Sequence, residues 1–223
     1  MSDIRIMDLI KWGKKGVQVR DANDTYTGLH QQQGTLDGAC AVYSIVMALL
    51  AHGVFLENDL DVYKKGDKRG PKGKLLSMLL EEQGFIKGGY SFKTLKSEMM
   101  DYADKLNFSL IRRDPEEGHA EMISQYIDDE NPVVISVVGK YVNHALLAVG
   151  YERNSEDRVT KILCLDPGVP APKYAPWNCY IDVASNSKSD FPFYYSAGDC
   201  AVYLDDMIAV LPAEKSERAE QVN

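Results

Sequence analysis

The chain is 223 residues long, and 45% of its residues are hydrophobic, which is ordinary for a globular protein. Its formal net charge of −8 at pH 7 argues against nucleic-acid binding, which normally needs a clustered basic surface. The longest apolar run, residues 39–51, is too short to span a bilayer, and the N-terminus lacks the basic start and apolar stretch of a secretory signal. We therefore expect no membrane insertion, and a protein that is either cytoplasmic or exported without such a signal.

The front part of the chain shows helical periodicity. Residues 40–52 are almost all apolar, which predicts a helix buried on every side, with Gly53 as its stop. Apolar residues three and four positions apart predict amphipathic helices over residues 75–84 and 92–106. Another helix is predicted over residues 117–129 and ends before Pro132. Residues 108–111 are a short strand candidate between the last two of these helices.

The back part of the chain has the pattern of strands. Short runs rich in Val, Ile and Leu, each bounded by turn residues, predict strands over residues 132–138, 144–151 and 159–166, joined by hairpin connections. A long irregular stretch follows at 168–198, and loops of that length are usually functional or mobile. Two more strands are predicted at 200–203 and 207–211, and a flexible polar tail at 214–223.

Helices followed by an antiparallel sheet make an α+β layout. We expect a single domain over residues 1–213, with a helical part at about 25–130 and a sheet part at about 131–213, because no linker divides the chain. The helix that starts at Cys40 would pack against the sheet that carries His144. This packing would place the reactive side chains in the crevice between the two parts.

A cysteine at the start of a buried helix is the most informative feature of the sequence. Cys40 follows a polar, glycine-containing turn and opens the apolar helix. A helix N-terminus carries unpaired N–H groups and a partial positive charge, which favour a thiolate over a thiol. A buried structural cysteine has no need of that position, although free cysteines are often buried. Cys40 is therefore the candidate nucleophile.

Three further residues complete a candidate catalytic set. His144 begins a predicted strand, and Asp166 ends the next one. As an imidazolium, His144 would lower the pKa of Cys40, and Asp166 would accept a hydrogen bond from the far ring nitrogen and fix the ring. Gln33 would hold an oxyanion together with the Cys40 backbone N–H. The consecutive glutamines at 31–33 leave open which of them has this role.

With these residues the chain resembles the papain-like cysteine peptidases. In that superfamily a glutamine precedes Gly-x-Cys at the start of the central helix, a histidine begins a strand that ends in Gly-Tyr, and an Asn or Asp follows on the next strand. The matching pieces here are Gln33, Gly38-Ala39-Cys40, the strand at 144–151 and Asp166-Pro167. The resemblance covers about residues 31–168 and is closer to compact bacterial members, the staphopain and bacteriocin-processing types.

The sequence also departs from this family. Asp37 precedes the glycine, where plant and lysosomal members have a Cys-Gly pair, and Ala41 replaces the usual aromatic residue. The spacing from Gln33 to Cys40 is one residue longer than the family pattern. Asp166 in place of asparagine is found in the bacteriocin-processing type.

The resemblance implies a thiol protease that cleaves amide bonds in protein or peptide substrates through Cys40, His144 and Asp166, without a metal or organic cofactor. Two alternatives stay open. The same triad could deamidate or transamidate glutamine side chains, as bacterial effector toxins of this fold do, and the partner would then be a host target protein. Alternatively, the chain is a catalytically inactive papain-like binding module.

The remaining cysteines and histidines carry no clear chemical signal. No two of the four cysteines have the spacing of a metal-binding pair, and the four histidines are scattered, so we expect no metal site. Cys164, Cys179 and Cys200 are expected to be core residues, and their pairing into disulfides is left open.

Overall fold

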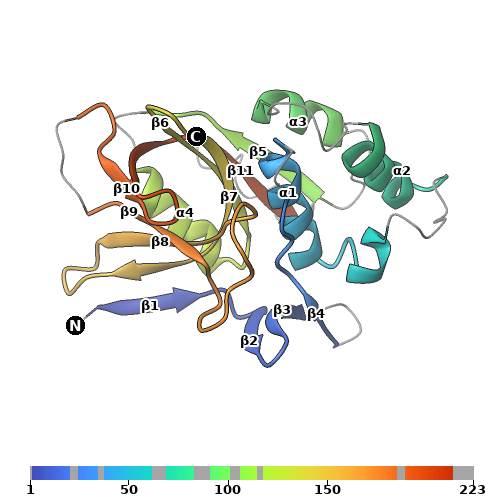
Figure 1. Ribbon diagram of the computed structural model, residues 1–223, viewed down its shortest axis with the longest axis horizontal. Coiled ribbons are helices and arrows are strands. Elements are labelled where there is room, and N and C mark those ends of the chain that lie inside the picture. The colour runs from blue at the N-terminus through green and yellow to red at the C-terminus, as the bar shows by residue number, and fades with distance from the viewer. Residues whose placement is uncertain are drawn as a thin grey trace.

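The computed structural model describes residues 2–20, 25–34, 38–61, 69–82, 91–100, 106–114, 118–184 and 189–212. Its helices and antiparallel sheet form an α+β fold, which confirms the predicted fold class (Figure 1). The predicted tail at 214–223 and the last two residues of the helix predicted over 75–84 lie outside the described residues.

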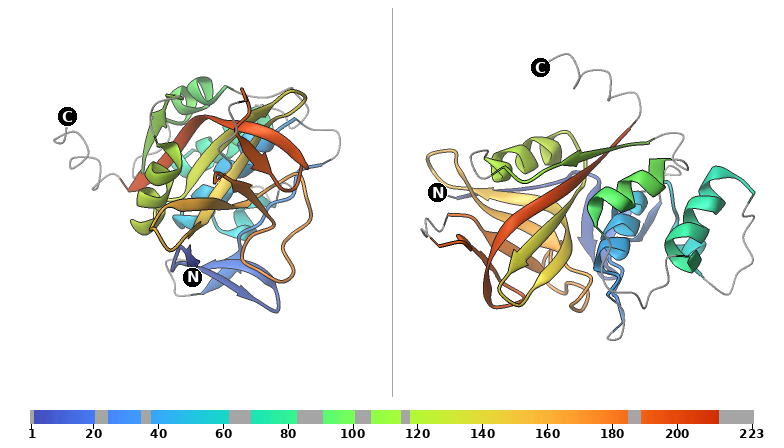
Figure 2. Two further views of the ribbon diagram at one scale, coloured as in Figure 1. Left: turned by 90° about the vertical axis from the view of Figure 1, so that its left-hand side faces the viewer. Right: turned by 90° about the horizontal axis from the view of Figure 1, so that it is seen from above.

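An eight-stranded antiparallel sheet dominates the fold. The strand order is β1-β7-β6-β11-β10-β9-β8, β8 also pairs with β7, and β5 pairs with β11. The strands from β6 to β11 therefore close into a barrel-like ring, which the two further views in Figure 2 also show. The strands are β1 (Asp3–Ile6), β5 (Leu106–Ile111), β6 (Val133–Gly139), β7 (Asn143–Arg153), β8 (Val159–Leu165), β9 (Cys179–Asp182), β10 (Phe193–Tyr195) and β11 (Cys200–Pro212).

Strands β6 and β7 lie at the centre of the fold. Residues 133–137 and 145–151 are buried, which explains why both strands are continuous apolar runs rather than alternating ones. Their antiparallel register sets Val137 opposite His144 and Ser136 opposite Ala145. The register thus fixes where His144 stands on the sheet.

A β-bulge interrupts β11 where this strand pairs with β6. Leu204 pairs with Val137 and Met207 pairs with Ile135, so two residues of β11 stand opposite the single residue between those partners on β6. A bulge of this kind bends the strand and re-aims its side chains.

Helix α1 (Cys40–Ala51) packs against β6 and β7. Ten of its twelve residues are buried, as its nearly uniform apolar sequence predicts. Gly53 follows the end of the helix and adopts a φ of 67°, and the N–H groups of Gly53 and Val54 donate to the carbonyls of Leu50 and Leu49. This is the Schellman arrangement that favours glycine, and it confirms Gly53 as the stop.

The other helices cover the sheet from two sides. Helix α4 packs on β7 and β8, and α3 packs on β5 and β11, while α2 continues into a π-helical turn, η2. Figure 2 shows α4 separated from α1, α2 and α3 across the sheet. The helices are α2 (Pro71–Ser77), η2 (Met78–Glu82), α3 (Phe92–Met100), α4 (His119–Asp128) and the short 3-10 helix η1 (Glu57–Leu60).

Several predicted boundaries were wrong. Of the helix predicted over 92–106, residues 92–100 are helical and residues 101–105 lie outside the described residues, but Leu106 already belongs to β5, inside the part predicted to be helical. The irregular stretch at 168–198 contains β9 and β10, and β11 is one long strand rather than two short ones. These strands are short or interrupted by a bulge, so their apolar pattern is weak.

The sequence did not predict the strands at the N-terminus. Strand β1 pairs with the far half of β7, and a separate three-stranded sheet is formed by β2 (Ile10–Gly13), β3 (Gly16–Arg20) and β4 (Tyr26–Gly28). Strands of three to five residues give too few alternations to be recognised by periodicity. Among the described helices, none combines the length and apolar character needed to cross a membrane.

Candidate active site

Cys40 is the first residue of α1 and faces β7. Its sulfur accepts hydrogen bonds from the backbone N–H groups of Ala41 and Ala145 and interacts with the ring of His144. Burial raises the pKa of the Cys40 thiol, but the hydrogen bond and charge of His144 and the two N–H groups outweigh burial, and the pKa is lowered. Donors aimed at a sulfur stabilise the thiolate.

A second contact holds α1 on the strand that carries the histidine. The Ser44 hydroxyl donates to the Ala145 carbonyl oxygen at 3.1 Å, and Ser44 is fully buried. Ala145 therefore bonds α1 through both of its backbone groups, to Ser44 and to Cys40. This pair of bonds fixes the helix start beside His144.

His144 links the sulfur to a carboxylate. Its Nε2 lies 2.6 Å from Oδ1 of Asp166, which leaves Nδ1 for the hydrogen bond with Cys40. Burial lowers the pKa of His144, but the hydrogen bonds and charges of Asp166 and Cys40 raise it to about 9. The ring is therefore an imidazolium at neutral pH, and it lies between two groups that favour its charge.

Asp166 is held in place by donors to both of its oxygens. Oδ1 accepts the Gly168 N–H at 2.6 Å in addition to His144, and Oδ2 accepts the hydroxyl of Tyr195. The side chain is only 1% exposed. Burial raises the pKa of the Asp166 carboxyl, but the hydrogen bonds and the charge of His144 outweigh it, and the pKa is lowered. The carboxylate is thus charged although it is buried.

The missing side chain of Gly168 allows its backbone N–H to approach the Asp166 carboxylate. A Cβ at this position would lie 3.1 Å from Oδ1 of Asp166 and 3.3 Å from Nε2 of His144, where it would crowd both atoms of the pair. The glycine therefore lets the backbone N–H reach the carboxylate.

The backbone of Asp166 is clamped by two polar residues. Asn178 accepts the Asp166 N–H at 2.7 Å and donates to the Asp166 carbonyl oxygen at 2.9 Å, and it also donates to the carbonyl of Pro170. A ring nitrogen of His30 lies 2.9 Å from the same Asp166 carbonyl oxygen. Burial lowers the pKa of His30, and its contacts with Asp166 only partly offset this, so His30 can act as a neutral donor.

Gln33 is the glutamine that lies beside Cys40. It lines the same cleft, and its backbone N–H donates to the Pro167 carbonyl at 2.9 Å. Its Oε1 is buried and has no hydrogen-bond partner among the described residues. Gln31 and Gln32 line a different pocket, against the side of α1. Of the three glutamines, the structure thus brings only Gln33 to the cysteine.

Three of the four candidate residues line an open cleft of about 570 Å³. Cys40, His144 and Gln33 line it, and Asp166 lies behind His144. The cleft is further lined by Gly38, Ala41, Ser91, Phe92, Ser136, Asn143, Ala145, Asp205 and Asp206. In the described part of the chain, no group of His, Cys, Asp or Glu side chains has the arrangement of a metal site.

The structure adds site residues that the sequence did not reveal. Tyr195, Asn178 and His30 all support Asp166 from segments that are distant in sequence. Two of them come from the stretch predicted to be irregular, and no local motif marks them. The pairing of β8 with β9 and of β9 with β10 brings Asn178 and Tyr195 to Asp166.

Comparisons with known proteins give a distant structural likeness. The sequence matches no protein-family profile and no curated protein. Among solved structures, the crystal structure of UfSP from C. elegans is similar over 94% of this chain and 34% of that chain, with 14% sequence identity and a TM-score of 0.41. This chain therefore spans about a third of the length of that structure. The chemistry of the site has to be judged from its own geometry.

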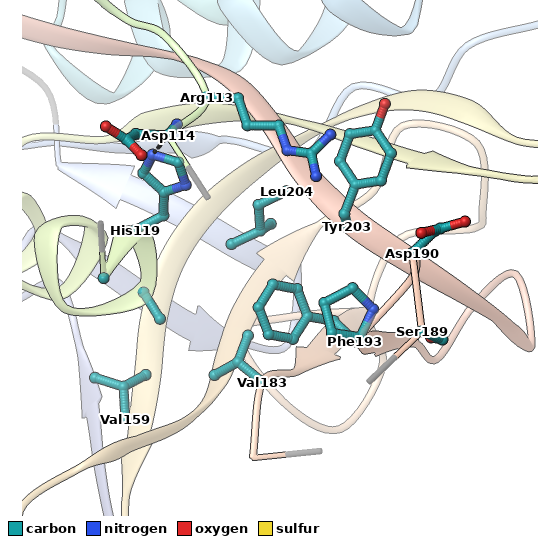
Figure 3. A pocket seen from close by; sticks show the side chains of 13 residues that line it. Arg113, Asp114, His119, Val159, Val183, Ser189, Asp190, Phe193, Tyr203 and Leu204 are labelled. Atoms are coloured by element: carbon teal, nitrogen blue, oxygen red, sulfur yellow. Dashed lines mark hydrogen bonds between the residues drawn. The ribbon is translucent and has the colours of Figure 1, made fainter. Parts of the chain in front are cut away.

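A second cavity, of about 480 Å³, lies elsewhere on the sheet (Figure 3). The guanidinium of Arg113 stacks on the ring of Tyr203, with 3.8 Å between its carbon and the ring centroid. His119 accepts the Asp114 N–H through Nε2 at 3.2 Å. None of the described residues that line this cavity is a cysteine.

Proposed function

We propose that the protein is a papain-like thiol hydrolase that cleaves amide bonds in protein or peptide substrates. The observation that supports this most strongly is that His144 is hydrogen-bonded to both Cys40 and Asp166, while Cys40 lines an open cleft. The lowered pKa of Cys40 and the raised pKa of His144 together favour a thiolate–imidazolium pair, which is the reactive form of such a nucleophile.

In the proposed reaction the Cys40 thiolate attacks the carbonyl carbon of the substrate amide. The carbonyl oxygen becomes an oxyanion, which the Cys40 backbone N–H and the side-chain amide of Gln33, both in the lining of the cleft, would hold. The His144 imidazolium gives its proton to the leaving amine, and an acyl-Cys40 intermediate remains. His144 then takes a proton from water, the resulting hydroxide attacks the acyl group, and the thiolate is restored.

The first test replaces the nucleophile. Cys40→Ser is expected to lower the hydrolysis of a peptide mixture by at least about a thousandfold, because a hydroxyl is a far weaker nucleophile than this thiolate. Cleavage is measured by mass spectrometry of new peptide termini. Cys200→Ser is the matched control, since Cys200 is also half-buried and free, and it should keep full activity. Full activity in Cys40→Ser would contradict the proposal.

Peptide masses test the first alternative, and alkylation of Cys40 tests the second. If the substrate amide is a glutamine side chain, the leaving group is ammonia and the peptide gains about one dalton without new termini. If the chain is a binding module, a neutral alkylating reagent will label Cys40 no faster than Cys200 at mildly acidic pH.

A further inference from the structure

Two adjacent carboxylates lie in the same cleft as Cys40. Asp205 and Asp206 form the bulge of β11, they are half-buried, and both line the cleft. Ser136 on β6 stands opposite this bulge, and Ala145 on β7 stands next to Ser136. Two strand spacings, roughly 10 Å, therefore separate the bulge from the Ala145 N–H that bonds the sulfur of Cys40. That is a distance which a neighbouring side chain of a bound peptide can cover.

The acidic pair has no ion-pair partner among the described residues. None of the ion pairs in that part of the chain includes Asp205 or Asp206, and the described lining of the cleft contains no Lys or Arg. The Arg113 backbone N–H donates to Asp206 at 3.1 Å. The guanidinium of Arg113, however, lies on the ring of Tyr203 in the second cavity (Figure 3).

The charge of Asp206 disfavours the charge of Asp205. Burial raises the pKa of Asp205, and the charge of Asp206 raises it further; the Asp206 N–H and the charge of Arg113 oppose these effects without cancelling them. Like charges this close are unfavourable unless a cation lies between them. The bulge therefore places two carboxylates that repel each other beside the nucleophile. Unfavourable arrangements of this kind are typical of functional sites.

The hydroxyl group of Ser136 lines the same cleft as the two carboxylates. Ser136 is 8% exposed and lines the cleft opposite the acidic pair. In the described part of the chain its side chain makes no hydrogen bond, and its hydroxyl is not among the fully buried polar atoms that lack a partner, so it is open to the cleft. Two carboxylates and one hydroxyl oxygen give three acceptor groups around one space. An ammonium group has three N–H donors, and a guanidinium has five.

We propose that Asp205, Asp206 and Ser136 form a subsite for a positively charged side chain of the substrate, a lysine or an arginine close to the amide bond that Cys40 attacks. The subsite rests on the proposed thiol hydrolase and specifies its substrate class. The cation replaces its lost hydration with these three acceptor groups and relieves the repulsion between the two carboxylates.

The test measures the charge preference of Cys40 without requiring turnover. Cys40 is labelled with three methanethiosulfonates that differ in charge: the aminoethyl (cationic), methyl (neutral) and sulfonatoethyl (anionic) reagents. Peptide mapping gives the rate at Cys40 alone. In Asp205→Asn/Asp206→Asn the ratio of cationic to anionic labelling rates is expected to fall by about tenfold, because two negative charges are removed at short range.

The control removes the same number of negative charges at the other end of the sheet. Asp3 and Glu156 are exposed on β1 and on the β7–β8 connection, and Asp3→Asn/Glu156→Gln should leave the ratio unchanged. Asn keeps the acceptor oxygen for the Arg113 N–H, so the bulge should persist. An unaltered neutral rate shows that Cys40 and its surroundings are intact. If the double variant does not fold, Asp205→Asn alone is used, with about half the effect on the logarithm of the ratio.

A second measurement uses peptide amides that differ at one position, carrying Lys, Arg, Gln or Glu. The wild-type protein should prefer Lys or Arg by about tenfold in kcat/KM, and the double Asn variant should lose this preference. An unchanged labelling ratio in a folded Asn variant overturns the subsite. A Cys40 that reacts no faster than Cys200 overturns the proposed hydrolase instead, and the ratio can still be measured at higher pH.

Discussion

At the scale of single residues, the site depends on His144 having charged or hydrogen-bonding neighbours on both sides. Its pKa of about 9 is the balance between burial, which lowers it, and the contacts with Asp166 and Cys40, which raise it. The pKa of Cys40 moves the opposite way, below its ordinary value of 9.0. The thiolate and the imidazolium therefore coexist in a window that ends as the pH rises through about 9.

The pH profile of hydrolysis should be bell-shaped, with its maximum inside this pH window. We expect kcat/KM to rise as Cys40 loses its proton at a pH below 9.0 and to fall as His144 loses its proton near pH 9. Asp166→Asn removes the carboxylate charge, so the alkaline limb should move to lower pH. Rates over the pH range for both proteins, with the His144 ring signals followed by NMR, check this. An alkaline limb at the same pH in both proteins would contradict it.

The two neighbouring tyrosines of β10 differ in burial and in hydrogen-bond partner. Tyr195 is buried and donates to Asp166, and burial together with the Asp166 charge raises the pKa of Tyr195. Tyr194, beside it, is more exposed and donates to Asp199 at 2.8 Å. Tyr195→Phe should cost about 1–2 kcal/mol of unfolding free energy, since Oδ2 of Asp166 is left without its donor.

The same substitution should move the titration of the site. Without the tyrosine donor the pKa of Asp166 rises and that of His144 falls, so the alkaline limb of the hydrolysis profile shifts to lower pH. Tyr194→Phe removes one hydroxyl from the same strand and should leave both the profile and the stability nearly unchanged. Urea unfolding and the pH profile of both variants provide the comparison, and equal effects in the two would rule out the role of Tyr195.

At the scale of the elements, three connections build the site: the start of α1, the first residues of β7 and the turn after β8. The sequence predicted all three, because a buried helix with a glycine stop and two apolar strands bounded by turn residues have strong local patterns. Cys40, His144 and Asp166 occupy the ends of these elements, where polar residues interrupt apolar runs, and could therefore be selected from the sequence.

Other parts of the site have no local signal. Asn178 and Tyr195 bond Asp166 only because β9 and β10 follow β8 in the sheet. The bulge that exposes Asp205 and Asp206 depends on the register between β6 and β11. Long-range register follows from the packing of the whole sheet, so the sequence alone could not give these positions.

The turn after β8 can be tested through Asn178. Asn178→Ala removes the hydrogen bonds to both backbone groups of Asp166 and to Pro170, so we expect a loss of about 2–3 kcal/mol and a slower alkylation of Cys40. Asn154→Ala is the control, since Asn154 bonds the N–H groups of Glu156 and Arg158 in the β7–β8 connection. It should lower stability without slowing the alkylation of Cys40. Equal alkylation rates in both variants would exclude a positioning role for Asn178.

At the scale of the whole molecule, the N-terminal strand ties the far edge of the sheet together. Arg5 on β1 lies 2.9 Å from Glu130, which also accepts the N–H groups of Asp8 and Leu9. Strand β1 passes Gly150 of β7 so closely that a Cβ there would lie 2.4 Å from the Ile6 side chain and 2.5 Å from the Arg5 carbonyl oxygen. The glycine is therefore required for this pairing.

Gly150→Ala should loosen β1 without changing the site. We expect a loss of about 1–3 kcal/mol in urea unfolding, because the backbone oxygen cannot move aside as a flexible side chain would. Hydrogen exchange at the β1 amides should become faster, while Cys40 alkylation stays the same. Gly70→Ala, whose added Cβ meets nothing within 4 Å, is the control. Unaltered exchange in β1 would show that the strand tolerates the extra methyl group.

The bonds that join α1 to β7 connect residues about a hundred positions apart, as the Ser44 to Ala145 separation of 101 illustrates. During synthesis the ribosome therefore releases Cys40 long before His144 and Asp166. Until then the cysteine is an ordinary thiol, mostly protonated at cellular pH. If Cys40 is the nucleophile that we propose, a nascent or truncated chain lacks its enhanced reactivity, which begins only when the fold is complete.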